Sequence, residues 1–194
     1  TYANIVAIAQ TNIKRLLAYS GIAQMGNILI GMAAGTKMGN DAILFYLLTY
    51  LFANIGAFAV VIAMSQAIGS EEINDYSGLN RRSPFLAFSM LLFLLSLAGV
   101  PPLAGFVGKF VVLLAVVEDQ RLWLAAIGAL NVAISLYYYL MVVRRMYLRP
   151  PTALQPIPVD PVTRCVLYAL MGGIVLIGVF QEPFLRLMAS AIQF

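Results

Sequence analysis

Long apolar stretches alternate with short polar segments along the entire chain, and this pattern predicts an all-α bundle of membrane-spanning helices. A helix needs about 20 predominantly apolar residues to cross the hydrocarbon core of a bilayer. Five stretches reach this length, and we predict them as the spans of a single transmembrane domain that includes residues 1–194. The predicted spans are residues 16–34, 42–68, 84–117, 122–143 and 162–180.

The two ends of the sequence are too short to cross a membrane. Residues 1–9 have the composition of the end of a preceding apolar helix, and residues 183–194 form a short amphipathic tail. The sequence opens with neither a Met nor a basic segment followed by a cleavage site. We therefore interpret it as the C-terminal part of a longer protein.

One predicted span, residues 84–117, is interrupted by residues that break helices. Its helix breakers are Gly99, Pro101, Pro102 and Gly105, within SLAGVPPLAGFVGKF. Proline cannot continue a helix because it lacks a backbone N–H and clashes with the preceding turn. We expect non-helical backbone at this point, at membrane depth, with carbonyl groups turned toward a polar cavity.

The positions of the basic residues indicate that this broken segment crosses the membrane once. Each half has roughly 16 residues, a marginal length for a span, so two short crossings are the alternative. A single crossing places eight Lys and Arg residues on one side and three on the other, whereas two crossings give six and five. Positive charge gathers on the cytoplasmic or matrix side, so we predict a single Pro-broken crossing. The eight residues are Lys14, Arg15, Arg81, Arg82, Arg144, Arg145, Arg149 and Arg164.

Composition supports a membrane protein and excludes several kinds of site. The chain is 62% hydrophobic and 10% charged, whereas soluble domains are about 45–50% apolar and about 25% charged. Its net charge of +4 comes from residues at helix ends, so we expect a lipid bilayer as a partner and no nucleic acid. The sequence has no His and a single Cys, Cys165. We therefore expect no metal site, no iron–sulfur cluster and no disulfide in this chain.

Lys109 is the strongest candidate functional residue because it lies inside the broken apolar segment. A charged amine at membrane depth costs at least about 2.5–3.5 kcal/mol on insertion scales. All eight acidic residues fall in predicted loops, so its counter-charge must come from water, from carbonyl groups at the break, or from a part outside this sequence. Desolvation disfavours the ammonium form, which lets the amine gain and lose a proton as a relay requires. The alternative is a lysine that snorkels to the interface near Glu118.

Tyr46, Tyr50 and Asn54 form a polar stripe in the second predicted span. Their spacing places all three on one helical face, where phenol and amide groups can hold water. The alternative is ordinary hydrogen bonding between helices, worth about 0.6 kcal/mol per contact. Spacing alone favours that alternative. Similar polar positions occur in other spans, at Gln24, Asn27, Asn131, Ser135 and Tyr138.

Two motifs resemble the antiporter-like membrane subunits of respiratory complex I, the NADH–quinone oxidoreductase. QTNIKRLLAYSGIAQMG resembles their NIKR-LLAYS signature, and LSLAGVPPLAGFVGKF resembles their broken-helix signature. The motifs occur in the order of the family, and the resemblance extends over the entire sequence. YLLTYLFANIGAFAVV most resembles the branch called chain N. Sister subunits tend to carry a His–His–Lys relay where this sequence has Tyr46, Tyr50 and Asn54, so that titratable relay is absent here.

The resemblance implies an architecture and a set of roles. The sequence corresponds to the C-terminal inverted-repeat half of an antiporter-like subunit, whose Glu and central lysines lie in the other half. Lys109 corresponds to the terminal titratable residue of a proton pathway, and Lys14 to a basic position of the NIKR signature, where a topological anchor is the simpler interpretation. The implied partners are other membrane subunits of complex I, including the sister antiporter-like subunits.

We therefore predict a proton-translocating subunit of NADH–quinone oxidoreductase with no redox centre in this chain. NADH, FMN, iron–sulfur clusters and quinone are expected in other subunits, because this sequence has no nucleotide fingerprint and no cluster ligands. The predicted location is a bacterial inner membrane, with the mitochondrial inner and thylakoid membranes as alternatives. The alternative functions are a subunit of a multisubunit cation/proton antiporter and a non-translocating membrane scaffold.

Overall fold

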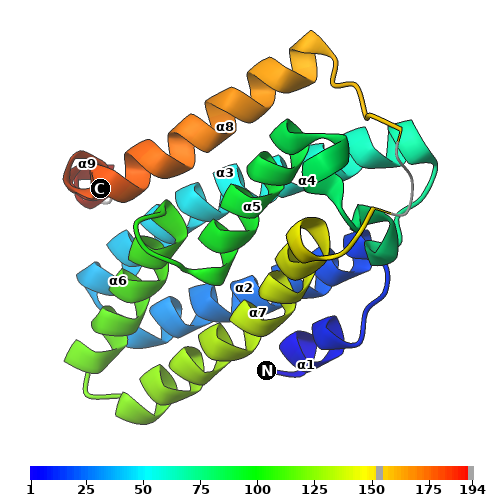
Figure 1. Cartoon of the computed structure of the whole chain (residues 1–194). Helices are drawn as coiled ribbons and strands as arrows, with labels where there is room; N and C mark the ends of the chain where they lie inside the picture. The colour runs from blue at the N-terminus through cyan, green and yellow to red at the C-terminus, as the bar shows by residue number, and fades with distance from the viewer. Residues whose placement is uncertain (152–154, 192–194) are drawn as a thin grey trace.

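The computed structural model describes residues 1–151 and 155–191, and within these residues the chain is a bundle of helices. In chain order the elements are α1 (Tyr2–Ile8), α2 (Ile13–Ala34), α3 (Lys37–Ile68), the 3₁₀ helix η1 (Ile73–Tyr76), α4 (Leu79–Arg82), α5 (Pro84–Ala98), α6 (Ala104–Glu118), α7 (Leu122–Leu148), α8 (Pro161–Val179) and α9 (Gln181–Ala191). Figure 1 shows the long helices side by side in one elongated bundle. Four of them, α2, α3, α7 and α8, are long and apolar enough to cross a membrane. The predicted all-α membrane bundle is confirmed.

Helix α3 is the central element of the bundle, and it packs against α2, α5, α6, α8 and α9. The helix begins at Lys37, five residues before the predicted span, which starts at residue 42. The reason is local, because the Thr36 side chain accepts the backbone N–H of Gly39 and caps the helix. Asp41, which we expected in a loop, therefore lies in the first turns of α3.

The two halves of the broken segment follow one path along the bundle. These halves, α5 and α6, contact successive parts of α3. Phe93 of α5 lies against Gly56, where an added Cβ would come within 2.3 Å of its ring, and Gly108 of α6 lies against Thr49, nearer the start of α3. Since the contacts advance along α3 in one direction, α6 continues the path of α5 and does not reverse it (Figure 1).

The ends of three later elements also differ from the predicted boundaries. Helix α7 continues to Leu148, beyond the predicted end at residue 143, and stops where Arg149 takes extended φ and ψ of −96° and 147° before Pro150. A residue that precedes proline is disfavoured in the helical region. Glu118 and Glu182, expected in loops, lie in α6 and α9. The last part of the predicted tail, residues 192–194, lies outside the described residues.

Three polar connections meet at one end of the bundle and hold each other by backbone hydrogen bonds. The N–H of Ile13 donates to Glu71 O at 2.9 Å, and the N–H of Ile73 donates to Thr11 O at 2.8 Å. Gly78 N–H donates to Arg145 O at the end of α7 at 3.1 Å. These bonds bring most of the predicted group of eight basic residues to the same end.

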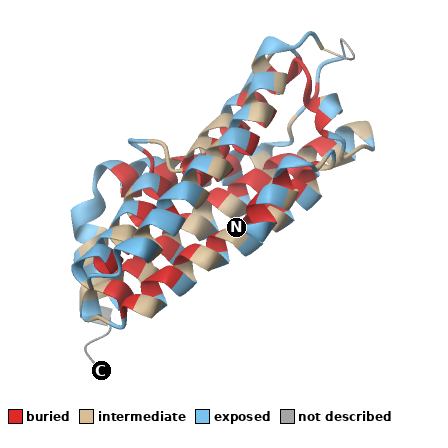
Figure 2. Cartoon of the chain, turned by 90° about the horizontal axis from the view of Figure 1, so that it is seen from below, coloured by how far each residue is buried: buried red, intermediate tan, exposed pale blue. Residues whose placement is uncertain are grey.

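The interior of the bundle contains both apolar side chains and a minority of polar ones, whereas its exterior is largely apolar. Figure 2 shows buried positions along the inward faces of the helices and exposed positions on the outward faces. Large apolar residues such as Ile22, Leu29 and Leu130 are each 60–63% exposed. An outer surface of this kind suits a lipid or protein environment and not water.

Candidate functional site

Lys109 is buried in α6 and is held by the end of the preceding half-helix. The residue is only 5% exposed. The Nζ atom donates to Leu97 O at 2.7 Å and to Ala98 O at 3.2 Å. The last carbonyl groups of a helix have no partner inside the helix, and they carry the negative end of its dipole. The break therefore supplies the partial negative charge that a buried ammonium group requires.

Two glycines of the break allow the amine to approach these carbonyls. Gly99 ends α5 with φ of +86°, and a Cβ added there would lie 3.0 Å from Cδ of Lys109. A Cβ on Gly105 would lie 1.8 Å from Ser96 O, which no side chain can occupy. The backbone N–H of Gly105 also donates to Ser96 Oγ at 3.2 Å. Both positions therefore require glycine.

The two prolines of the break shape the outer side of the junction. Pro101 and Pro102 are both exposed, and the peptide bond between them is cis. Gly178 of α8 lies directly against this segment, since an added Cβ would come within 2.3 Å of Pro102 O. Close packing of α8 thus covers the end of the break that faces away from Lys109.

Gln24 of α2 connects the carbonyl group that holds Lys109 to polar residues of two other helices. Its Nε2 atom donates to Leu97 O at 3.1 Å and to the hydroxyl group of Tyr139 at 3.3 Å. Its Oε1 atom accepts from Asn27 Nδ2 at 3.0 Å and from the hydroxyl group of Tyr46. Since Gln24 is only 2% exposed, all four bonds are shielded from solvent.

Tyr139 is a member of this network that sequence reasoning missed. It is fully buried, and its hydroxyl group contacts Ser20 as well as Gln24. Its position four residues after Ser135 places it on the same face of α7 as that noted polar residue. This spacing could have identified Tyr139 from the sequence, but the sequence analysis named the neighbouring Tyr138 as the polar position.

The members of the predicted polar stripe lie in different environments. Tyr46 is buried, and its hydroxyl group bonds to Gln24 and also accepts from Asn27 Nδ2 at 3.0 Å. Tyr50 is half-buried and lies beside Lys109, whereas Asn54 is half-buried but does not reach the site. Among the described residues, no hydrogen bond involves the Asn54 side chain.

Two small cavities flank Lys109. The first, which we call the α3 cavity, is lined by Tyr46, Thr49, Tyr50 and Ser96 together with Gln24 and Lys109. The second, the α7 cavity, is lined by Asn4, Asn27, Asn131 and Ser135, again with Gln24 and Lys109. In each, the centre of a water molecule has about 10 Å³ to occupy, which is room for one water.

The α7 cavity is bordered by a chain of polar side chains between α1 and α7. Asn4 Nδ2 donates to Asn131 Oδ1 at 2.9 Å, and the hydroxyl group of Tyr138 donates to Asn4 Oδ1 at 3.0 Å. Ser135 points its hydroxyl group at Val132 O within its own helix, at 2.8 Å. The predicted polar positions of α7 therefore face the interior and reach the vicinity of Lys109.

Lys14 lies away from this site, at the end of the bundle where the polar connections meet. Its ammonium group pairs with the carboxylate of Glu71, which also accepts from Asn12 Nδ2 at 3.2 Å. These two hydrogen bonds, first that of Lys14, hold the pKa of Glu71 below its ordinary value. Lys14 is the second residue of α2 and is about 15 Å along the helix from Gln24, at 1.5 Å per residue.

No metal or redox centre is indicated in the part of the chain that the structure describes. Residues 1–151 and 155–191 contain no cluster of three His, Cys, Asp or Glu side chains. Cys165 is exposed near the start of α8. Lys109 has no carboxylate partner among the ion pairs within these residues. The groups around the Lys109 amine are the carbonyl groups of Leu97 and Ala98 and the hydroxyl and amide side chains that line the two cavities.

Curated relatives are similar over nearly the entire chain. The NADH-quinone oxidoreductase subunit N of Moorella thermoacetica is 45% identical over 193 residues, which are 98% of this chain and 40% of that protein. The subunit N of Heliobacterium modesticaldum is 47% identical over 181 residues, 93% of this chain and 38% of that protein. The chain thus spans about two fifths of the length of these relatives.

Solved structures have the same arrangement of helices. A chain of respiratory complex I from Thermus thermophilus with bound NADH matches with a TM-score of 0.88 and 30% identity, covering 98% of this chain and 41% of that one. A chain of the Mrp complex from Dietzia sp. matches with a TM-score of 0.89 and 22% identity, covering 98% and 44%. The latter similarity concerns the fold alone. Residues 1–135 also match the family described as NADH:quinone oxidoreductase/Mrp antiporter, TM. The chain belongs to this family of antiporter-like membrane subunits.

Proposed function

We propose that this chain is part of a proton-translocating membrane subunit of an NADH–quinone oxidoreductase, with Lys109 as a residue that carries protons. The observation that supports this most strongly is the buried amine of Lys109, held by the end of a broken helix between two water-sized cavities. An amine with this environment has partners for its charged form and access to water for the exchange of a proton.

The geometry allows Lys109 to lose its proton without leaving its main partner unsatisfied. Leu97 O accepts from Lys109 and also from Gln24, so the neutral amine can release this carbonyl group while Gln24 still donates to it. An unpaired buried carbonyl group would otherwise cost about 1–3 kcal/mol. Gain and loss of the proton can therefore follow changes in neighbouring charge, driven by quinone reduction elsewhere in the complex.

The other predicted site residues have supporting roles in this proposal. Tyr46 orients Gln24 next to Lys109, and Tyr46 and Tyr50 both line the cavity proposed to hold water. The glycines and prolines of the break keep the carbonyl groups in place. Lys14, paired with Glu71 at the surface, is a titratable group at the end of the bundle and not a neighbour of Lys109. It is proposed to exchange protons with solvent there.

The proposed assembly is a bacterial complex I, in the inner membrane, with sister antiporter-like subunits as neighbours. The bacterial relatives and the complex I chains with the same fold support this placement. NADH, FMN, iron–sulfur clusters and quinone are proposed to bind other subunits. The sequence has no nucleotide fingerprint, and the described residues include no group of three or more His, Cys, Asp or Glu that could hold a metal.

A cation/proton antiporter is the second candidate function, because the family includes Mrp antiporter subunits. Its support is the shared fold of the Mrp complex chain, at lower sequence identity than the complex I chain. The two candidates differ in what drives ion movement. NADH-dependent pumping supports the first, and sodium-dependent proton exchange without NADH supports the second.

The test is replacement of Lys109 in the full-length subunit within the assembled complex. Lys109→Met removes the titratable amine but keeps a similar apolar volume, so we expect assembly with a markedly lower rate of proton pumping and of quinone reduction. Lys109→Arg should also impair pumping, because a guanidinium group does not deprotonate in proteins. Pumping is measured with a pH-sensitive dye in proteoliposomes supplied with NADH and quinone.

Lys37→Met is the matched control, since Lys37 is exposed at the start of α3, away from the break. This variant should pump at the wild-type rate. Wild-type pumping by fully assembled Lys109→Met would reject the role of Lys109 and favour the scaffold alternative.

A further inference from the structure

Gln24 and Lys109 occupy a special position among the described residues, because both line the α3 cavity and the α7 cavity. The α3 cavity opens toward Thr49 and Tyr50, and the α7 cavity toward Asn131 and Ser135. The two sets of residues are otherwise separate. One further contact joins them, because Asn27 Nδ2 of the α7 cavity donates to the Tyr46 hydroxyl group of the α3 cavity at 3.0 Å. The boundary between the cavities therefore consists of this contact and of the two side chains, Gln24 and Lys109, that line both.

The two side chains differ in what they can do with a proton. The amine of Lys109 can bind and release one, whereas the carboxamide of Gln24 does not titrate in the physiological range. Gln24 is also held in a fixed orientation, with two donated and two accepted hydrogen bonds to four different partners. Its side-chain amide therefore has all its hydrogen bonds made within the protein.

We infer that Gln24 is the main partition between the two cavities, and that protons pass between them through the amine of Lys109, because the carboxamides of Gln24 and Asn27 do not titrate in the physiological range. This inference rests on the proposed function and adds a positioning residue to it. Gln24 neither gains nor loses a proton. It separates one water from another and fixes the carbonyl group that Lys109 binds.

A smaller residue at position 24 should join the cavities. Each cavity has room for about one water, and the space vacated by the Gln24 side chain borders the four polar groups that now bond to it, so further waters would fill it. A continuous chain of waters conducts protons without a titratable side chain. Protons would then pass between the two cavities along the waters, and this passage would not depend on Lys109.

The experiment measures passive proton leak through the assembled complex in proteoliposomes, with an imposed pH gradient and without NADH or quinone. Gln24→Ser should increase the leak several-fold over the wild-type complex and lower the protons pumped per NADH, while NADH–quinone turnover continues. Gln24→Asn, which shortens the amide by one methylene, should give a smaller increase. Lys109→Met combined with Gln24→Ser should leak as much as Gln24→Ser alone.

Thr49→Ala and Ser135→Ala are matched controls. Each residue lines only one cavity, and each hydroxyl group bonds to a carbonyl group of its own helix, Tyr46 O and Val132 O. Neither control should raise the leak. An equal leak in the controls would show that any loss of volume near Lys109 suffices, and it would overturn the assignment to Gln24.

The outcomes separate this inference from the proposed function. If Lys109→Met abolishes pumping but Gln24→Ser and Gln24→Asn do not leak, Lys109 keeps its role and the partition is rejected. If Lys109→Met pumps normally, the proposed function fails first, whatever the leak. Failure of both Gln24 variants to assemble would make Gln24 a folding residue and would also overturn the inference.

Discussion

At the scale of single residues, the hydrogen-bond partners of Lys109 are backbone carbonyl groups. This explains why the sequence did not identify which residues bind its amine. The sequence predicted a buried lysine beside a helix break and three possible sources of counter-charge. The structure provides the carbonyl groups of Leu97 and Ala98, two apolar residues that carry no polar side chain. A search for acidic partners could not find them, because the relevant atoms belong to the main chain and become available only where the helix ends.

The network around Gln24 was also beyond prediction, for a different reason. Helical spacing placed Gln24 and Asn27 on one face of their helix, but it could not indicate which other helix they meet. The actual partners are Tyr46 of α3 and Tyr139 of α7, which lie 22 and 115 residues away in sequence. Such long-range pairs depend on the packing of the whole bundle.

Tyr46 and Asn54 should differ in their importance for activity, although they belong to the same predicted stripe. Tyr46→Phe removes a hydroxyl group that bonds to both Gln24 and Asn27, so we expect a clear loss of pumping. Asn54→Ala removes no hydrogen bond within the described residues, and it should reduce pumping only in part. The measurement is the pumping rate in proteoliposomes, with assembly checked by native electrophoresis. Complete loss of pumping in assembled Asn54→Ala would contradict this account of α3.

At the scale of elements, hydropathy predicted the long helices well but misjudged where two of them end. The missed boundaries were the start of α3 and the end of α7, where polar or charged residues continue a helix beyond its apolar part. Capping by Thr36 and the stop before Pro150 decide these ends. Composition averaged over a span does not detect such single-residue effects.

The close contact between α5 and α6 at Gly105 can be tested by adding a single methyl group there. Gly105→Ala places a methyl group where Ser96 O already lies, so α6 must move away from α5. The shift would withdraw Lys109 from Leu97 O. We expect a lower melting temperature of the full-length subunit in detergent and a strong loss of pumping in the complex.

Gly26→Ala is the matched control, because an added Cβ at this helical glycine meets no atom within 4 Å. Alanine favours a helix over glycine by about 0.5–1 kcal/mol, so this variant should be as stable as the wild type or slightly more stable. Equal behaviour of the two variants would mean that the junction tolerates a wider separation than the structure indicates.

At the scale of the whole molecule, the distribution of charge follows the path of the chain. Lys37 at the start of α3 and Arg121 just before α7 lie at one end of these helices. Both helices finish at the other end, where Lys14 of α2 and Arg145 of α7 lie beside the hydrogen-bonded connections. Figure 1 shows α5 and α6 between α3 and α7, along a single path through the bundle. The count of charges predicted this arrangement because a basic residue at a helix end reports on which side of the membrane that end lies.

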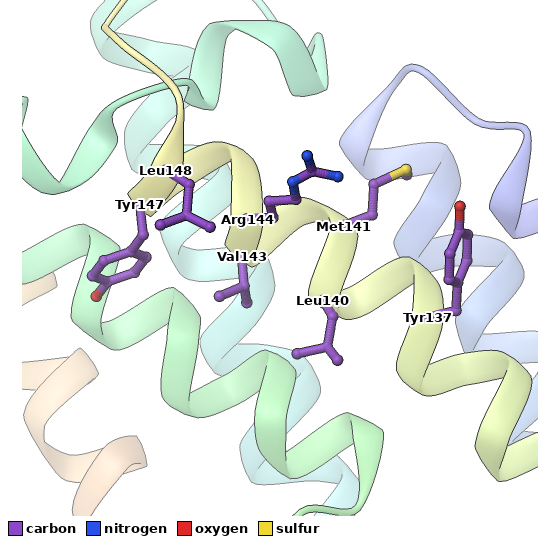
Figure 3. A pocket seen from close by; sticks show the side chains of 7 residues that line it. All are labelled: Tyr137, Leu140, Met141, Val143, Arg144, Tyr147 and Leu148. Atoms are coloured by element: carbon purple, nitrogen blue, oxygen red, sulfur yellow. The ribbon is translucent and has the colours of Figure 1, made fainter.

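The outer face of α7 carries a groove. The groove is lined mainly by apolar side chains, including Tyr137, Leu140 and Met141, with Arg144 near its middle (Figure 3). Relatives are longer than this chain by more than a factor of two, since it covers 40% of the Moorella thermoacetica protein. The occupant of the groove could not be deduced from the sequence, because it depends on chains or segments that these residues do not contain.

The single crossing of the broken segment can be tested from outside the membrane by labelling of introduced cysteines. In a full-length subunit with its other cysteines, including Cys165, replaced by serine, one cysteine is placed at Glu72→Cys or at Glu118→Cys. Both positions are exposed, one in the polar connection before α5 and the other at the end of α6. A membrane-impermeant maleimide is applied to spheroplasts and to inverted vesicles.

The expected result is opposite accessibility. Since the eight basic residues predict a cytoplasmic location for the connection before α5, Glu72→Cys should be labelled only in inverted vesicles. Glu118→Cys should be labelled only in spheroplasts, because one crossing carries the chain to the other side. If α5 and α6 each crossed the membrane, both cysteines would react from the same side. That result would remove the break from membrane depth, and with it the physical reason for a lysine held by carbonyl groups at that point.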